Sequence, residues 1–216
     1  MMAFDSPRLI ADIGGLYARF AIETSYGEFV QQRSLRCADF PSFEAAVAAY
    51  LASLKSASVA HAAVAIANPV DGDQVRLTNY HWQFSIEETR VNLGLETLVV
   101  VNDFTALAMA LPRLGPQDFR QVGAGQAVKN SVIGLLGSGS GLGVSGLIPS
   151  GDGWTSLGSE GGHTSFAPSD AREAAVLAYM WRHFDHVSFE RLLSGPGLEL
   201  TYLALAELDH MQVKAL

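Results

Sequence analysis

Apolar side chains recur along the chain with two spacings, one typical of strands and one typical of helices. Where hydrophobic and polar residues alternate, or where a short apolar run is bounded by turn residues, we expect a strand. Strands are expected at residues 9–13, 18–23, 28–34, 62–67, 75–78, 97–101, 131–136 and 144–148. Apolar residues three or four positions apart predict helices at residues 41–54, 105–111, 169–184 and 196–208. Ser85 followed by Glu88 predicts a capping box, and Gly94 is expected to end that further short helix.

The order of these elements predicts the fold class. Strands linked as hairpins come first and strands that alternate with helices follow, which is typical of an α/β protein with a mixed sheet and helices on its faces. The loop-rich segment 112–129 is expected to separate two lobes, residues 1–115 and 116–216. In such sheets ligands bind at the carboxyl ends of the strands, so the polar residues at those ends are the candidate site.

Composition and charge narrow the class of protein. Hydrophobic residues make up 49% of the 216 residues and charged residues 17%, so the chain can bury a sizeable core and is neither disordered nor fibrous. The formal net charge of −8 disfavours a nucleic-acid partner. The single cysteine, Cys37, excludes an internal disulfide and fits a reducing compartment. The N-terminus lacks a signal-peptide pattern and glycines interrupt the longest uncharged run, 131–151, so we expect a cytoplasmic protein without a membrane partner.

The first candidate for chemistry is Asp12, which precedes Gly14 and Gly15 at the end of the first predicted strand. Two glycines allow the backbone to approach a phosphate closely, and a carboxylate beside them suits a hydrated Mg²⁺. The same residues also fit an ordinary hairpin turn, and taken alone they favour that interpretation.

A glycine-rich loop is expected from Gly137 to Gly143, between the last two predicted strands. Its backbone N–H groups and serine hydroxyls are typical of an anion nest for phosphates, although a flexible turn has the same composition. The match to G-x-G-x-x-G at residues 141–146 is weak, because a strand follows where the dinucleotide fingerprint needs a helix. The sequence contains neither a Walker element nor a G-x-S-x-G element, so a P-loop nucleotide site and a serine hydrolase of the G-x-S-x-G type are both excluded.

Polar residues at two other places suit a substrate rich in hydroxyl groups. Asn102 and Asp103 directly follow an apolar predicted strand, where a carboxylate can take a proton from a hydroxyl or simply cap the next helix. Glu160 and His163, in a glycine-rich segment, and Glu190 further along are side chains that accept hydrogen bonds from a polyol. For His163 alone, an ordinary loop histidine is the simpler interpretation.

Together these pieces resemble the bacterial glucokinase family, ATP-dependent hexose kinases of the sugar kinase and actin-like superfamily. The resemblance extends from Leu9 to about Leu205 and is carried by LTNYHWQFSIEETRVNLG, VVNDFTALAMALP, GSGSGLGV, GSEGGHTSFAP and VSFERLLSGPGL. It implies a two-lobe, ribonuclease H-like or actin-like ATPase fold and the transfer of phosphate from ATP to O6 of glucose, the first step of glycolysis. It also implies Mg²⁺ as the metal, and a homodimer fits it because related enzymes often dimerise through the second lobe.

The resemblance further implies a role for each candidate residue. Asp103 would be the catalytic base that takes the proton from the 6-hydroxyl of glucose. The residues implied to bind glucose are Asn102, Asp103, Glu160, His163 and Glu190. Those implied to bind the phosphates of ATP are Asp12, Gly14, Gly15, Gly137, Ser138, Gly139, Ser140 and Gly141, with Asp12 also holding the metal.

Two departures from the family pattern bear on the expected activity. Leu16 and Tyr17 follow Gly15 where the family usually has threonine and asparagine, so an isobutyl group replaces a hydroxyl that would donate to phosphate. The resemblance also ends inside the second lobe, which is therefore expected to be incomplete. The alternative function is thus a catalytically impaired or silent sugar-binding relative, or a truncated remnant of a glucokinase.

Overall fold

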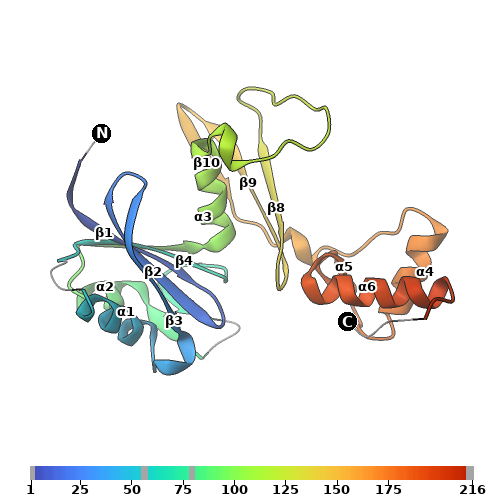
Figure 1. The fold of residues 1–216 in the computed structure, drawn as a ribbon, viewed down its shortest axis with the longest axis horizontal. Helices are drawn as coiled ribbons and strands as arrows, with labels where there is room; N and C mark the ends of the chain where they lie inside the picture. The colour runs from blue at the N-terminus through green and yellow to red at the C-terminus, as the bar shows by residue number, and fades with distance from the viewer. Residues whose placement is uncertain (1–2, 55–57, 78–80, 213–216) are drawn as a thin grey trace. The chain divides into compact units, whose positions relative to one another are not determined.

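The computed structural model describes residues 3–54, 58–77 and 81–212, and its elements are labelled in Figure 1. The chain forms two compact units, Met1–Leu107 and Ala108–Leu216, each with a hydrophobic core of its own. The lobe border expected from the sequence, after residue 115, lies a few residues further along the chain than this division.

The first unit is built on a five-stranded sheet with the strand order β3-β2-β1-β4-β7. These strands are β1 (Ala3–Ile13), β2 (Tyr17–Ser25), β3 (Glu28–Arg36), β4 (His61–Ile66) and β7 (Thr97–Asn102). Strand β1 pairs antiparallel with β2 and parallel with β4, and β4 pairs parallel with β7. The predicted α/β class with a mixed sheet is therefore confirmed.

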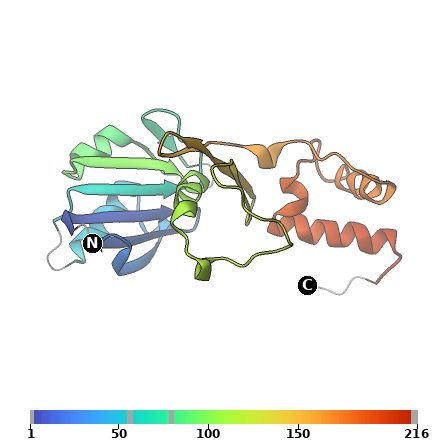
Figure 2. The same ribbon diagram turned by 90° about the horizontal axis from the view of Figure 1, so that it is seen from above.

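One face of this sheet carries the core of the first unit. Alternate residues of the strands are buried, for example Leu9, Ala11 and Ile13 in β1, because successive side chains of a strand point to opposite faces. Helices α1 (Phe43–Ala52) and α2 (Ile86–Asn92) cover this face. Figure 2 shows the sheet from its other side, with both helices behind it.

Side-chain caps fix where these two helices begin. The hydroxyl of Ser42 accepts the backbone N–H of Ala45 at 3.1 Å, and the hydroxyl of Ser85 accepts that of Glu88 at 3.0 Å. Gly94 follows α2 with a φ of +67°, a conformation that glycine adopts without strain. The predicted start and end of α2 are therefore present in the structure.

Short elements connect the larger ones. A two-stranded antiparallel hairpin joins β5 (Gln74–Arg76) to β6 (Gln83–Ser85), and Thr78 of the predicted strand 75–78 lies outside the described residues. Helix α3 (Asp103–Ala110) follows β7. Single turns of 3-10 helix lie at Cys37–Asp39, Leu111–Arg113, Pro116–Asp118 and Gly161–His163.

The second unit combines a three-stranded antiparallel sheet with a group of helices. Its strands, in the order β10-β9-β8, are β8 (Ile133–Ser138), β9 (Leu142–Ser150) and β10 (Gly153–Leu157). Its helices are α4 (Ala171–Met180), α5 (Glu190–Leu193) and α6 (Gly195–Leu208). Met180 and Ala204, both fully buried, lie at the centre of the helical core.

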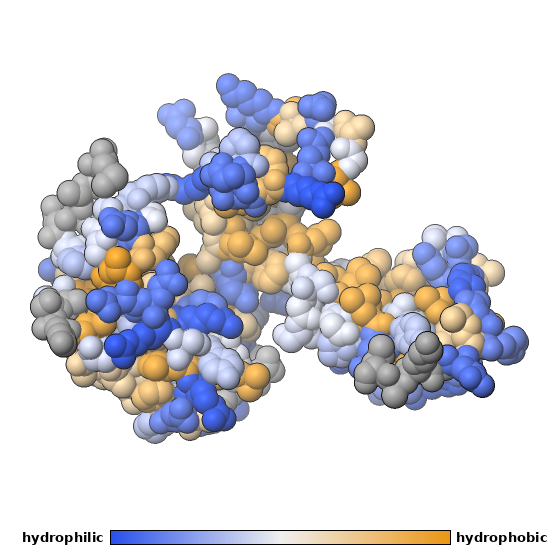
Figure 3. Space-filling view, in the orientation of Figure 1, coloured by the Kyte–Doolittle hydropathy of each residue, from blue (hydrophilic) through white to orange (hydrophobic). Residues whose placement is uncertain are grey.

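The sheet of the second unit leaves apolar side chains at its surface. Leu136 is 72% exposed, and Ile148 and Leu157 are more than a third exposed. Figure 3 shows apolar side chains gathered over this part of the molecule. Among the described residues, no helix is both long and apolar enough to cross a membrane.

The structure corrects three expectations from the sequence. The glycine-rich loop expected from Gly137 to Gly143 is a tight turn of Gly139–Gly141, because its outer residues extend β8 and β9. Strand β10 was not expected, and it forms by pairing with β9, with Trp154 opposite Pro149. Helix α3 begins at Asp103 instead of residue 105.

Candidate functional site

The candidate residues of the first unit lie where parallel strands end. The register of β1, β4 and β7 aligns Ile13, Ile66 and Asn102 in one row across the sheet. Asp12 lies one position before this row, and Asp103 lies one position after it. The strand pairing therefore brings Asp12, Asn102 and Asp103 to the same edge of the sheet, as expected for the carboxyl ends of parallel strands.

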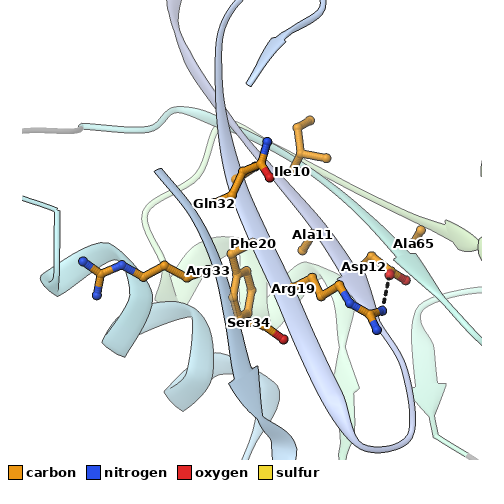
Figure 4. A pocket seen from close by; sticks show the side chains of 10 residues that line it. Ile10, Ala11, Asp12, Arg19, Phe20, Gln32, Arg33, Ser34 and Ala65 are labelled. Carbon is orange, nitrogen blue, oxygen red and sulfur yellow. Dashed lines mark hydrogen bonds and ion pairs between the residues drawn. The ribbon is translucent and has the colours of Figure 1, made fainter. Parts of the chain in front are cut away.

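Asp12 forms an ion pair with an arginine from the neighbouring strand. Its Oδ2 accepts a hydrogen bond from Nη1 of Arg19 at 2.8 Å, and the two residues lie opposite each other in the β1–β2 register. Both side chains remain more than half exposed. Figure 4 shows the pair at the wall of a cavity of about 430 Å³, which Gln32 and Ser34 of β3 also line. Arg19 thus holds the carboxylate that is the candidate for the metal.

The turn after Asp12 keeps its glycines and exposes Leu16. The N–H of Gly14 donates to the carbonyl of Tyr17 at 3.0 Å, and the carbonyl of Leu16 accepts the N–H of Cys37 at 3.0 Å. The side chain of Leu16 is 77% exposed, so it is an apolar group on the surface of the turn. Burial raises the pKa of the Cys37 thiol, which keeps it protonated and unreactive.

The hydrogen bonds of Asn102 and Asp103 show which of these two side chains caps α3. The side-chain oxygen of Asn102 accepts the N–H groups of Phe104 and Thr105 at 3.0 and 3.1 Å, so Asn102 acts as the cap of α3. Oδ1 of Asp103 accepts the N–H of Phe104 at 2.8 Å and Nδ2 of Asn102 at 3.1 Å. Within the described part of the chain, Oδ2 of Asp103 has no hydrogen-bond partner, so this oxygen is available to a substrate.

The surroundings of Asp103 make it a stronger base than an ordinary aspartate. Burial raises the pKa of this carboxyl, and the negative charge of Asp12 raises it further. Hydrogen bonds from Phe104 and Asn102 act in the opposite direction, and the net effect is an increase. A raised pKa brings a general base closer to the pH at which proton transfer is efficient.

The candidate residues of the second unit surround the turn between β8 and β9. Within the turn, the N–H of Gly139 donates to the carbonyl of Gly141 at 2.8 Å, and the carbonyl of Gly139 accepts the N–H of Gly195 at 2.8 Å. The hydroxyl of Ser138 donates to the carbonyl of Leu193. In the described residues, the amides of Ser140 and Gly141 carry no hydrogen bond. These two amides are therefore the groups of the turn that are available to an anion.

Glu160, His163 and Glu190 form a small cluster next to this turn. Nε2 of His163 lies 3.7 Å from Oε2 of Glu160, and its Nδ1 lies 3.8 Å from Oε1 of Glu190. Glu160 and His163 are largely exposed, whereas Glu190 is 22% exposed. Gly162 has no room for a side chain, because a Cβ there would collide with the carbonyl of Leu142. The glycines of this segment thus allow the cluster to lie against β9.

The structure therefore groups the predicted residues into one cluster in each unit. Arg19 was not among the candidate residues predicted from the sequence, although its position opposite Asp12 follows from the register of the first two strands. Gly195 was not among them either, because its contact with the turn depends on tertiary packing. In the part of the chain that is described, no group of three or more His, Cys, Asp or Glu residues could hold a metal ion.

Comparisons with known proteins agree on one family. The family model described as glucokinase matches residues 9–216. The chain is 60% identical over 211 residues to "Bifunctional protein glk" of Burkholderia orbicola, covering 98% of this chain and 33% of that protein. It is 52% identical over 203 residues to "Glucokinase" of Chromobacterium violaceum, covering 94% of this chain and 58% of that protein. The chain therefore spans between a third and about three-fifths of the length of these relatives.

Solved structures give the same result at the level of the fold. The crystal structure of a glucokinase from an Antarctic psychrotroph superposes with a TM-score of 0.84 at 36% identity, covering 99% of this chain and 68% of that one. A glucokinase from Balamuthia mandrillaris shares the fold at 20% identity, with a TM-score of 0.71 and coverage of 96% of this chain and 64% of that one. Because the family model matches nearly the whole sequence, the chain belongs to the glucokinase family.

Proposed function

We propose that this chain transfers the γ-phosphoryl group of ATP to the 6-hydroxyl of glucose and forms glucose 6-phosphate. The observation that carries the proposal is the carboxyl of Asp103, with a raised pKa and one unpartnered oxygen, at the strand edge that it shares with Asp12. Family membership supports the same reaction. Two structural neighbours, a glucokinase from Balamuthia mandrillaris and a ROK family glucokinase from Streptomyces griseus, are complexes with glucose, and the second also contains AMPPNP.

In the proposed reaction Asp103 acts as the general base. O6 of glucose forms a bond to the γ-phosphorus, the bond between that phosphorus and the bridging oxygen of ADP breaks, and Asp103 receives the proton of the hydroxyl. Phosphoryl transfer of this kind depends mainly on positioning and on stabilisation of charge. The remaining residues of the site are therefore proposed to bind and orient the two substrates.

The proposed sugar contacts use mainly hydrogen-bond acceptors. Asn102, Asp103, Glu160, His163 and Glu190 are the residues proposed to bind glucose. Each carboxylate offers oxygens that accept hydrogen bonds from hydroxyls, and the histidine can donate or accept according to its tautomer. Such a set suits a polyol substrate better than an apolar one.

The proposed nucleotide contacts use the two glycine-containing turns. Gly14 and Gly15 would allow a close approach of the backbone to phosphate, and the amides of Ser140 and Gly141 would donate hydrogen bonds to it. Gly137, Ser138 and Gly139 would shape this second turn. Asp12 fits Mg²⁺, because this ion is commonly held by one or two carboxylates together with substrate phosphates. The bound ion would supply positive charge next to the phosphates, and Arg19 would keep the Asp12 carboxylate in place.

One observation favours a second function, that of a sugar-binding protein without kinase activity. The exposed Leu16 lies in the turn proposed to face the nucleotide and offers no hydrogen-bond donor there. Calorimetric titrations with glucose and with Mg·ATP separate the two functions. Heat from both ligands supports the kinase, and heat from glucose alone supports the silent sugar binder.

The Asp103→Asn variant tests the proposed base directly. The amide keeps the size of the side chain and the hydrogen bond from Phe104, but it cannot take a proton. We expect turnover to fall by a factor of about 10² to 10⁴, with glucose affinity within a few-fold of wild type. Asp152→Asn, an equivalent change at an exposed turn, is the control. Equal turnover in Asp103→Asn and wild type would contradict the mechanism.

The proposed reaction also indicates a cellular compartment and a set of partners. A kinase that uses ATP and glucose would work in the cytoplasm, without nucleic acid or membrane as partners. The homodimer stays a prediction, and light scattering, which gives the mass of the purified protein in solution, tests it.

A further inference from the structure

Glu190 contacts two parts of the second unit that have different proposed roles. Its Oε2 accepts the backbone N–H of Leu142 at 3.0 Å, directly after the turn proposed to bind phosphate. Its Oε1 lies 3.8 Å from Nδ1 of His163, in the cluster proposed to bind sugar. Glu190 is also the least exposed carboxylate of this cluster, with 22% of its side chain accessible against 61% for Glu160. The two oxygens of one carboxylate therefore face two ligand regions.

The contact between Glu190 and the turn is close. A Cβ on Gly141 would collide with Oε2 of Glu190, so this carboxylate packs directly against the backbone of the turn. The residues that follow Glu190 hold the turn as well, because the carbonyl of Leu193 accepts the Ser138 hydroxyl and the N–H of Gly195 donates to Gly139. The segment from Glu190 to Gly195 thus contacts both sides of the turn.

A change at Glu190 would alter the phosphate-binding properties of the turn in two ways. The available amides of Ser140 and Gly141 immediately precede Leu142, so a shift of the Glu190 oxygen changes where these amides point. The negative charge of Glu190 also opposes a phosphate nearby. Hydrogen bonds donated by a sugar to this carboxylate fix its position and offset part of that charge.

We propose that Glu190 is a positioning residue that couples the binding of sugar to the binding of nucleotide. The proposal rests on the proposed function, because glucose and ATP are the two ligands that it links. Binding of glucose at Oε1 holds Oε2 against Leu142, and the turn is then arranged for phosphate. By thermodynamic reciprocity, nucleotide increases glucose affinity by the same factor.

The test measures this coupling factor by calorimetry. The Kd of the magnesium complex of AMPPNP is measured for the 216-residue chain with and without saturating glucose. In wild type we expect glucose to lower this Kd by about fivefold or more. In Glu190→Gln the ratio should be close to one, since a glutamine has one acceptor oxygen, cannot accept from Leu142 and from a sugar hydroxyl with separate oxygens, and carries no charge for the sugar to offset.

Glu160→Gln is the matched control. Glu160 also lies next to His163, and within the described residues no hydrogen bond or ion pair joins it to the turn, so its replacement should weaken glucose binding and keep the wild-type coupling ratio. Gly141→Ala disturbs the same contact from the side of the turn, with Glu190 intact, and should also bring the ratio close to one. In NMR spectra, the amide signal of Leu142 should shift on addition of glucose in wild type and Glu160→Gln, but not in Glu190→Gln.

The outcomes distinguish this proposal from the proposed function. If wild type binds both ligands and Glu190→Gln keeps the full ratio, the coupling role is wrong and the kinase proposal stands. Loss of the ratio in Glu160→Gln would also overturn the role of Glu190, because the effect would then belong to the whole cluster. If wild type binds neither ligand, both proposals are contradicted.

Discussion

At the scale of single residues, the raised pKa of Asp103 has opposite consequences for the proposed chemistry and for the stability of the fold. Asp103 is partly buried close to the charge of Asp12, and both effects disfavour its ionised form. The same environment that makes the carboxyl a better base therefore destabilises the folded chain at neutral pH. Functional carboxylates commonly show such perturbed pKa values.

The pH dependence of stability tests whether ionisation of Asp103 destabilises the folded chain. Because the pKa is raised in the folded chain, the stabilising effect of this carboxyl is complete below its unfolded value of about 3.8 and is lost as the pH rises through the folded pKa. We expect Asp103→Asn to gain melting temperature relative to wild type as the pH increases from acid to neutral. Thermal unfolding of both proteins across this range measures the difference. A constant difference, or one that shrinks with pH, would contradict the assigned environment.

Leu16 is the residue at which we expect a substitution to improve the proposed binding of nucleotide. Its exposed side chain contributes little to the core, so Leu16→Thr should leave the melting temperature unchanged. The new hydroxyl can donate to a charged phosphate, and a gain of about 1.5 kcal/mol would tighten binding of Mg·ATP roughly tenfold. Calorimetry measures the affinity. Leu16→Ala separates the two causes: if it tightens binding equally, relief of crowding and not the hydroxyl explains the gain.

At the scale of elements, buried contacts join α4 to α6, and exposed ion pairs join residues in or directly after these two helices. Arg172 forms two hydrogen bonds with Asp209, at 2.9 and 2.6 Å, and Arg182 forms two with Glu207, at 3.1 and 2.9 Å. These pairs are solvent-exposed, whereas Met180 is fully buried in the helical core. Packing at Met180 should therefore contribute more to stability than either ion pair.

Two substitutions compare these contributions. Met180→Ala should lower the free energy of unfolding of the second unit by about 2–5 kcal/mol, because it leaves a cavity in a packed core. Arg172→Gln should lower it by no more than about 1 kcal/mol, with an effect that decreases in high salt. Chemical denaturation at low and high salt measures both. A larger loss for Arg172→Gln than for Met180→Ala would contradict this assignment of stability.

Elements with regular hydrophobic spacing were predictable from the sequence. Strands β1, β2, β4 and β7 alternate buried and exposed residues, and α2 carries its cap and its final glycine in the sequence. Strand β10 was not predictable in this way, because its pairing with β9 and not its own pattern makes it a strand. The four-residue helix α5 is too short to show a helical period.

The candidate site was predictable as a set of residues and not as an arrangement. Asp12, Asn102 and Asp103 could be assigned to the carboxyl ends of predicted strands, but their shared edge depends on the parallel register of β1, β4 and β7. The contact between Glu190 and Leu142 joins residues that are 48 positions apart, and no local pattern indicates it. The ion pair of Arg19 with Asp12 lies between these cases, since it needs only the register of one hairpin.

At the scale of the whole molecule, each compact unit has its own core. The core of the first unit includes Phe43 and Val47 of α1, and that of the second is centred on Met180 and Ala204. Separate cores indicate that local stability is set within each unit. The two groups of candidate residues are therefore supported by different sets of packing contacts.

Hydrogen exchange measures this independence. Phe43→Ala should destabilise the first unit by about 3–5 kcal/mol and increase exchange of the backbone amides in β1, β4 and β7. Exchange in α4 and α6 should stay at the wild-type rate. Met180→Ala should give the opposite pattern. Uniform loss of protection in both units from either substitution would contradict independent cores.

The formation of glucose 6-phosphate by the 216-residue chain tests the central claim most directly. The chain is supplied with Mg·ATP and either glucose or 6-deoxyglucose, which lacks the hydroxyl that Asp103 is proposed to deprotonate. We expect phosphorylation of glucose at O6 and no phosphorylated product from 6-deoxyglucose, although this analogue should still bind. Absence of product from glucose, or a phosphorylated product from 6-deoxyglucose, would contradict the claim.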